Sequence, residues 1–168
     1  AIGCAEQSID DDEFFAVILA DDLIYNKGNN VLKQMKDAAF KNKKQVLALE
    51  KVNQEDVSKF GVVSVDSSKG RVSHLNDIVE KPENPPSNLA IGGIYLFDEN
   101  FWSYLDSAEA QHGDAFSISD ITRQYVHLGQ AKLLSVGQET WVDCGTPESL
   151  FFASQMAKDG KLNPKPFR

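Results

Sequence analysis

The sequence predicts a single α/β domain in which helices cover the faces of a mixed sheet. Two observations support this class. Strand-like apolar segments alternate along the chain with segments of helical periodicity. The 168 residues contain no internal repeat and no linker that would divide them, and this length is enough for one domain with its own core. We therefore treat residues 1–168 as one domain.

The strands are expected where apolar residues cluster between turn signals. Residues 14–20 are continuously apolar, which predicts a strand buried on both faces. Further strands are expected at 45–52, 61–66, 71–80, 89–97, 132–136 and 140–143. Residues 67–70, Ser-Ser-Lys-Gly, read as a hairpin turn, whereas the three prolines in 81–88 exclude regular structure there.

The helices follow from the apolar spacing and from their capping residues. A helix at 31–40 has Asn30 as a plausible N-cap, and Asp98 caps a short helix that ends near residue 105. Either Ser117 or Ser119 could cap a helix at 120–128. Residues 53–60 form a turn or short helix, the helix at 147–158 begins with proline, and the tail 160–168 is irregular.

Composition narrows the classes of partner. The net charge of −8 argues against nucleic acid, which needs a basic face, although a small anion needs only a few local cations. No apolar run has a membrane-spanning length, and no secretory signal is visible. The two cysteines, Cys4 and Cys144, form no CxxC pair, so we expect a reducing, cytoplasmic location.

Two acidic positions follow predicted strands. Asp21-Asp22 come at the end of the strand at 14–20, and Asp143 ends the strand at 140–143, just before a glycine turn. Ligands of open α/β sheets bind at the carboxyl ends of strands, and carboxylates there can hold Mg²⁺ beside a substrate phosphate. Each aspartate could equally serve as a turn or helix cap. The sequence spacing does not establish that they meet.

A second group of residues surrounds a proline turn. Glu80-Lys81-Pro82 places an acid and a base where a strand ends, so lysine could bind a phosphate and glutamate could accept from hydroxyls. A surface ion pair is the alternative. Gly61 and Gly92-Gly93 lie in or beside strands, where glycine marks either a bulge or a close approach to a ligand.

Taken together, these segments resemble one family, the nucleotidyltransferases that make UDP-glucose or dTDP-glucose from a nucleoside triphosphate and glucose 1-phosphate. The segments that carry the resemblance, in order, are Leu-Ala-Asp-Asp at 19–22, Phe-Gly-Val-Val at 60–63, Ile-Val-Glu-Lys-Pro at 78–82, Pro-Ser-Asn-Leu-Ala-Ile-Gly-Gly-Ile-Tyr at 86–95, Ser-Ile-Ser-Asp at 117–120 and Trp-Val-Asp-Cys-Gly-Thr-Pro-Glu at 141–148. The Ala-Asp-Asp start and the Pro-Ser-Asn-Leu-Ala-Ile run favour the uridylyltransferases, which use UTP.

The resemblance implies a fold, a reaction and a set of residue roles. The fold would be a mainly parallel Rossmann-like sheet with flanking helices, as in the nucleotide-diphospho-sugar transferases. The implied roles are metal binding for Asp21 and Asp143, phosphate binding for Lys81, hydroxyl binding for Glu80, and sugar-pocket lining for Gly61, Gly93 and Tyr95. With Mg²⁺ bound, glucose 1-phosphate would attack the α-phosphorus of UTP and release pyrophosphate. Such chemistry depends on positioning and charge neutralisation and needs no protein nucleophile.

The sequence departs from the family pattern in two ways. The glycine-rich loop that wraps the triphosphate is absent, so we expect a chain that lacks the N-terminal part and does not turn over UTP alone. Ala115 stands where relatives usually carry glutamate. Three alternatives remain: a non-catalytic sugar-phosphate-binding or regulatory domain, a thymidylyltransferase relative, and an α/β interaction module with coincidental motifs. An incomplete sheet also predicts a homo-oligomer or a partner chain over the uncovered surface.

Overall fold

The computed structural model describes residues 2–10, 13–25, 31–66, 74–135 and 140–162. The strands are β1 (Phe15–Ile18), β2 (Asp22–Tyr25), β3 (Gln45–Lys51), β4 (Gly61–Asp66), β5 (His74–Glu80), β6 (Leu89–Phe97), β7 (Ala131–Ser135) and β8 (Thr140–Asp143). The helices are α1 (Val31–Asn42), α2 (Asn100–His112), α3 (Ile118–His127) and α4 (Pro147–Lys158), with short 3₁₀ turns η1 (Ile2–Ser8), η2 (Val57–Lys59) and η4 (Gly113–Ala115). The expected mixed α/β class is confirmed.

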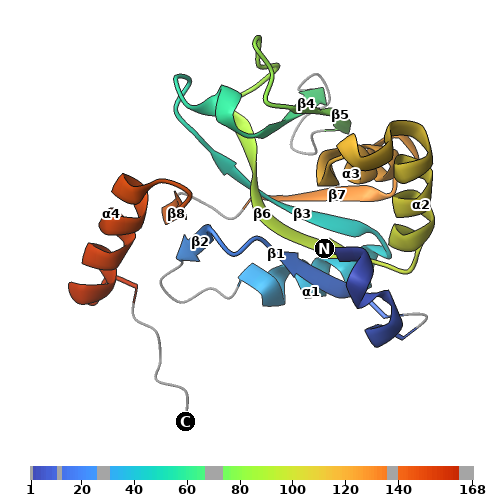
Figure 1. The fold of residues 1–168 in the computed structure, drawn as a ribbon, viewed down its shortest axis with the longest axis horizontal. Helices are drawn as coiled ribbons and strands as arrows, with labels where there is room; N and C mark the ends of the chain where they lie inside the picture. Colours follow the sequence, from blue (N-terminus) through green and yellow to red (C-terminus); the bar gives the residue numbers. More distant parts are fainter. Residues whose placement is uncertain (1, 11–12, 26–30, 67–73, 136–139, 163–168) are drawn as a thin grey trace.

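Six strands form one sheet in the order β5-β4-β6-β3-β7, with β1 also paired to β6, whereas β2 and β8 form a separate two-stranded ribbon. Figure 1 shows α2 and α3 on one side of the main sheet, α1 on the other, and α4 beside β8. The ribbon and α4 therefore stand at the margin of the sheet.

The expected dominance of parallel pairing needs correction. Only β3 and β7 pair in parallel within the described sheet, and the other pairings are antiparallel. The reason is the position of β6. It lies between β1, β3 and β4, which share one direction, and it runs opposite to all of them. The sheet is mixed because this reversed strand separates strands that would otherwise be parallel neighbours.

The expectation that the first strand is buried on both faces is wrong. Burial alternates along β1: Phe15 and Val17 are partly buried against the core, while Ala16 is exposed and Ile18 is 51% exposed. Among the described strands β1 pairs only with β6, and the exposure of Ala16 and Ile18 shows that its second face is open at these positions. A continuous apolar run could not distinguish this edge strand from a central one.

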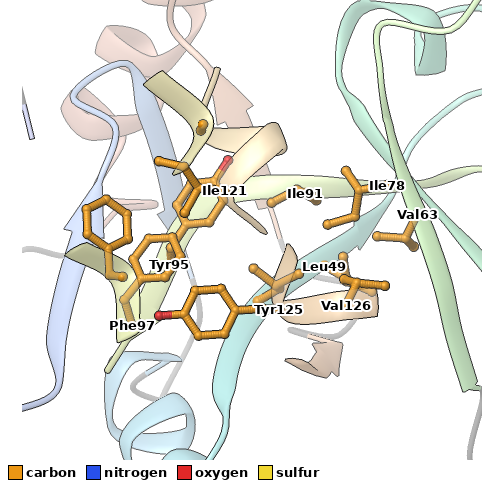
Figure 2. Packing of buried hydrophobic residues seen from close by; sticks show 12 residues of the cluster. Leu49, Val63, Ile78, Ile91, Tyr95, Phe97, Ile121, Tyr125 and Val126 are labelled. Atoms are coloured by element: carbon orange, nitrogen blue, oxygen red, sulfur yellow. The ribbon is translucent and has the colours of Figure 1, made fainter. Parts of the chain in front are cut away.

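The core lies on both faces of the main sheet. The larger cluster packs α2 and α3 on the sheet through side chains such as Phe97, Phe101 and Tyr125, all of them fully buried. Figure 2 shows the rings of Tyr95, Phe97 and Tyr125 close together, with Tyr95 and Phe97 stacked at 5.7 Å between centroids. A second cluster, which includes Met35, packs α1 on the opposite face. Because apolar side chains are buried on both of its faces, the main sheet should be stable and rigid.

Helix boundaries resolve the open points about capping. Ser117, not Ser119, is the N-cap of α3, and Asp120 completes a capping box by accepting from the Ser117 backbone amide at 2.8 Å. Glu99, not Asp98, is the N-cap residue of α2, although Asp98 Oδ1 accepts from the Asn100 amide at 3.1 Å. The helix continues to His112, beyond the expected end near residue 105. Asn30 and the expected hairpin at 67–70 lie outside the described residues. None of the described helices is long and apolar enough to cross a bilayer.

Candidate functional site

The β2–β8 ribbon brings the acidic positions together. Asp22 and Asp143 are direct partners in its antiparallel register, and the Cys144 amide donates to the Asp21 carbonyl at 2.7 Å. Residues more than a hundred positions apart along the chain thus lie side by side. The sequence suggested that Asp21 and Asp143 could meet, but it did not predict β2, whose pairing with β8 is the cause.

The carboxylates of Asp21 and Asp143 both approach Gly145. A Cβ on Gly145 would lie 2.9 Å from Asp143 Oδ1 and 3.6 Å from Asp21 Oδ2. The Gly145 amide donates to Asp143 Oδ1 at 2.8 Å, which fixes one of the two carboxylates. The glycine therefore leaves open the space on which two acidic oxygens converge, and such oxygens suit a hard divalent cation that keeps most of its water or phosphate ligands.

Asp22 occupies a different environment from its neighbour Asp21. Trp141 Nε1 donates to Asp22 Oδ1 at 2.5 Å, and the carboxylate lies against Gly93, where a Cβ would be only 1.8 Å from Asp22 Oδ2. Burial raises the pKa of Asp22 to about 6, the Trp141 hydrogen bond acts against this rise, and the charges of Asp21 and Asp143 add to it. Asp22 thus fastens the ribbon to β6.

The negative charges of the three aspartates also affect the Cys144 thiol. Burial raises the pKa of the Cys144 thiol, and the charges of Asp143, Asp21 and Asp22 raise it further. The thiol is consequently disfavoured as a nucleophile. No cluster of three or more His, Cys, Asp or Glu side chains arranged to hold a metal occurs within the described part of the chain. Any cation here would rely on Asp21 and Asp143 together with ligand oxygens.

A second polar group surrounds the end of β5. Gly61 and Glu80 are paired across β4 and β5, and Ser119 Oγ donates to Glu80 Oε2 at 2.6 Å. A Cβ on Gly61 would lie 3.1 Å from Glu80 Oε2 and 3.3 Å from Ser119 Oγ. Gly61 and Glu80 were expected near one another; Ser119 was considered only as a helix cap.

Lys81 has an unusual backbone. Its φ is +43°, in the left-handed region, and its amide donates to the Phe60 carbonyl at 3.1 Å. A residue with a Cβ is strained in this conformation, and glycine would fit it without that cost. Lys81 Nζ is 3.9 Å from Glu80 Oε1, and the lysine side chain is 67% exposed. Lys81 therefore occupies a backbone conformation that glycine would adopt with less strain.

Tyr95 and Gly93 are more deeply buried than residues that line an open sugar pocket. Tyr95 is 4% exposed and belongs to the core, and burial together with the charges of Glu80 and Asp22 raises the pKa of its phenol. Gly93 has a φ of +60°, and the Asp22 carboxylate fills the space where a Cβ would lie. The charges of Glu80 and Asp22, one from each polar group, thus both act on this buried phenol.

The two groups are connected physically. The Phe60 ring packs on Trp141 with centroids 4.7 Å apart, while the Phe60 carbonyl accepts from Lys81 and the Trp141 indole donates to Asp22. The hydrogen bond and charge of Asp56 raise the pKa of Lys59, next to Phe60, and the charge of Asp143 adds to this rise. One continuous set of contacts thus runs from the proline turn to the acidic ribbon.

Trp141 and Ser119 have no site role in the sequence-based prediction, and Asp22 appears there only together with Asp21 as a possible metal ligand or cap. Each stands inside a segment that had been singled out, next to or near a residue chosen for a role. What separates them from their neighbours is a side-chain contact, which the segments alone do not reveal. Ala115, the departure from the family pattern, lies exposed in η4.

Paired carboxylates at a strand end, linked through Trp141 and Phe60 to the turn that holds a lysine, are suited to a phosphorylated ligand and a divalent cation, the requirements of phosphoryl-transfer chemistry. Comparison with known proteins agrees with this class. The family model described as Nucleotidyl transferase matches residues 1–160. The chain therefore belongs to the nucleotidyl transferase family.

Individual relatives are similar over most of this chain. The UTP–glucose-1-phosphate uridylyltransferase YngB of Bacillus subtilis is 35% identical over 126 residues, which cover 74% of this chain and 42% of YngB. A UDP-glucose pyrophosphorylase solved in complex with UDP-glucose superposes with a TM-score of 0.79 at 32% identity, covering 94% of this chain and 60% of that one. A Bacillus anthracis protein assigned as a glucose-1-phosphate thymidylyltransferase, in complex with a sucrose, gives a TM-score of 0.78 at 27% identity, covering 94% and 59%. The chain thus spans about 40 to 60% of the length of these relatives.

Proposed function

We propose that this chain carries the sugar-phosphate-binding and metal-binding part of a uridylyltransferase that forms UDP-glucose and pyrophosphate from UTP and glucose 1-phosphate. The observation that carries the proposal is the meeting of Asp21 and Asp143 on the β2–β8 ribbon, next to the turn that holds Lys81. The names of the relatives point to the same reaction.

In this proposal Lys81 binds the phosphate of glucose 1-phosphate. Its ammonium group is mostly exposed at the turn, where it can act as a point charge. Glu80 presents the oxygen not bound to Ser119 to the sugar hydroxyls, and Gly61 beside it leaves room for the sugar. Gly93, which is buried against Asp22, supports the ribbon rather than contacting the sugar. Tyr95 is too deeply buried to contact a sugar over much of its surface, so we assign it a structural role in the core.

Asp21 and Asp143 would hold Mg²⁺ through the two oxygens that converge at Gly145. When bound, the ion would supply charge neutralisation for the phosphates of the nucleotide. The protein residues would hold the sugar phosphate in line with the α-phosphorus of UTP, so that attack on this atom expels pyrophosphate. No side chain needs to act as a nucleophile.

Lys81 offers a test that separates binding from folding. Replacing Lys81 by Gly removes the ammonium group and relieves the backbone strain at φ +43°, so the variant should be as stable as the wild type or about 1 kcal/mol more stable. Its affinity for glucose 1-phosphate, measured by calorimetry, should fall at least tenfold. Lys158→Ala on α4 is the matched control and should bind normally. Unchanged binding by Lys81→Gly would contradict the role of Lys81.

Turnover needs a second experiment, because the glycine-rich loop of the family is not among these 168 residues. Pyrophosphate release from UTP and glucose 1-phosphate should be absent for this chain alone. It should appear when the N-terminal segment of a full-length uridylyltransferase is added. Binding of glucose 1-phosphate without turnover under either condition would instead favour a non-catalytic, regulatory domain.

A thymidylyltransferase is the second candidate, and the Bacillus anthracis relative favours it. The complemented protein distinguishes the two. We expect a higher kcat/KM with UTP than with dTTP, and the reverse order would replace our proposal by this alternative.

We also propose that a second copy of this chain covers the outer side of α4. Leu150, Phe151 and Phe152 are 54%, 70% and 54% exposed there, while Ala153 and Met156 face the ribbon. Three adjacent large apolar side chains make an unusual surface for a monomer.

A further inference from the structure

The hydroxyl of Ser119 is committed to Glu80. Ser119 is 2% exposed, and its Oγ donates to Glu80 Oε2 at 2.6 Å, the short distance typical of a hydrogen bond to a carboxylate. The Glu80 side chain itself is 40% exposed. A buried donor thus holds the inner oxygen of a carboxylate whose other oxygen lies towards Lys81 and solvent.

The position of Ser119 is set by the way α3 docks on β5. One turn further along the helix, Arg123 donates from Nε and Nη2 to the Ile78 carbonyl, at 2.9 and 2.7 Å. Arg123 Nε also lies 3.2 Å from Asp77 Oδ1. Residues four apart share one face of a helix, so Arg123 and Ser119 contact the same strand two residues apart. The helix therefore clamps β5 directly before the proline turn.

Local capping leaves the Ser119 hydroxyl available for this contact. The N-cap function belongs to Ser117 and the capping box to Asp120, whose Oδ2 also accepts from Ser117 Oγ at 2.9 Å. A serine in the first turn often bonds to the backbone of its own helix. Here the side chain instead reaches across to the neighbouring strand.

Gly61 makes the contact possible from the opposite side. Any side chain on Gly61 would begin 3.1 Å from Glu80 Oε2 and 3.3 Å from Ser119 Oγ, tighter than ordinary packing. The glycine thus accommodates the hydrogen bond between the two side chains. Gly61 therefore has a structural role, leaving room for this hydrogen bond, in addition to its expected place in the sugar pocket.

We propose that Ser119 is a positioning residue: it fixes the Glu80 carboxylate so that the oxygen facing Lys81 stays directed towards the sugar hydroxyls. The inference rests on the proposed function in one respect, the assignment of Glu80 to the sugar. Without the Ser119 donor, the Glu80 side chain, which is 40% exposed, is free to change rotamer. This change would weaken recognition of the sugar while the contact of Lys81 with the phosphate remains.

Calorimetry with glucose 1-phosphate and with inorganic phosphate tests the role on the chain as it is. Ser119→Ala should weaken glucose 1-phosphate binding about tenfold, as expected for the loss of one charge-assisted hydrogen bond, and leave phosphate binding within about twofold. Ser119→Thr keeps the hydroxyl and should restore most of the affinity. Thr122→Val removes a buried hydroxyl of the same helix, which bonds to the Ile118 carbonyl, and should change neither affinity.

A double variant shows whether Ser119 acts through Glu80. In a Glu80→Ala background, Ser119→Ala should cause no further loss of glucose 1-phosphate affinity. Additive losses, or an equal loss of phosphate binding, would overturn the positioning role and indicate a general effect on α3.

An independent readout keeps this inference separate from the proposed function. Crystal structures of the wild type and of Ser119→Ala should show Glu80 in one rotamer and in several rotamers, respectively. An unchanged Glu80 conformation would overturn the positioning role whatever the ligand. Failure of the wild type to bind glucose 1-phosphate, with Glu80 displaced in the variant, would overturn the proposed function and leave the Ser119–Glu80 contact established.

Discussion

The main sheet and the β2–β8 ribbon each carry one half of the candidate site, and they are packed very differently. The main sheet holds fully buried side chains such as Phe97, Phe101 and Tyr125 between itself and α2 and α3. The ribbon and α4 share a small cluster of Val142, Ala153 and Met156, none of which is fully buried.

The difference indicates how the two halves are held in place. Glu80 and Lys81 project from a strand that is clamped by a helix over a large core, so their frame should be rigid. Asp21 and Asp143 depend on a two-stranded ribbon that is held to the sheet by a few contacts: Asp22 with Gly93, Ile24 with the α1 cluster, and Trp141 with Phe60. Regions with little apolar packing open at lower free energy. A cation or phosphate ligand should therefore stabilise the ribbon more than the sheet.

The largest effect should come from the main core. Phe101→Ala removes a fully buried ring that contacts Phe97 and Trp102, and we expect a loss of about 3–5 kcal/mol in the free energy of unfolding. Urea denaturation measures the change. Leu128→Ala, at a position 60% exposed, should cost less than about 0.5 kcal/mol. Similar losses for both variants would mean that the core on the main sheet does not dominate the free energy of unfolding.

A second variant acts where the ribbon meets the sheet. Gly93→Ala would place a Cβ 1.8 Å from Asp22 Oδ2, so Asp22 and the ribbon must move, and we expect a loss of about 2–4 kcal/mol together with weaker Mg²⁺ binding. Gly113→Ala is the control, because its φ is +57° and no atom lies within 4 Å of the new Cβ. It isolates backbone strain, which should cost about 1 kcal/mol. Equal losses would show that Asp22 does not press on Gly93.

The third prediction concerns pH. The folded-state pKa of Asp22 is raised from 3.8 to about 6, so its favourable contribution is complete below pH 3.8 and is lost as the pH rises through 6. Asp22→Asn keeps an acceptor for Trp141 and should be more stable than the wild type above pH 6, by about 1 kcal/mol after solvent screening.

The same variant gives a test of metal binding. Thermal unfolding from pH 4 to 8, with and without Mg²⁺, should show the difference shrinking when the ion neutralises Asp21 and Asp143. A stability difference that is flat with pH would contradict the raised pKa, and no response to Mg²⁺ would count against the cation site.

The smallest effect on folding is expected on the outer side of α4. Phe151→Lys changes a side chain that is 70% exposed, so the stability should move by less than about 0.5 kcal/mol. The average mass in light scattering should nevertheless fall towards that of the monomer. Leu128→Lys, at a position 60% exposed at the C-terminal end of α3, should leave the mass unchanged. A wild type that is monomeric at all concentrations would refute self-association through α4.

The sequence by itself determined the elements and the segments that carry the site. Apolar periodicity, prolines and capping residues located β3 to β8 and α1 to α4 to within a few residues, apart from the end of α2, because these signals are local. The segments quoted for the family resemblance also contained every residue of the candidate site. Local chemistry was sufficient to choose Asp21, Asp143, Glu80 and Lys81 as candidates.

Tertiary structure decided which of these residues meet and what holds them. The reversal of β6, the exposed face of β1, the pairing of β2 with β8 and the contacts of Asp22 with Gly93 and of Ser119 with Glu80 all join segments that are distant in sequence. Alternation along a strand or spacing along a helix says which way a side chain points, but not what stands opposite. That depends on long-range packing, which no local pattern records.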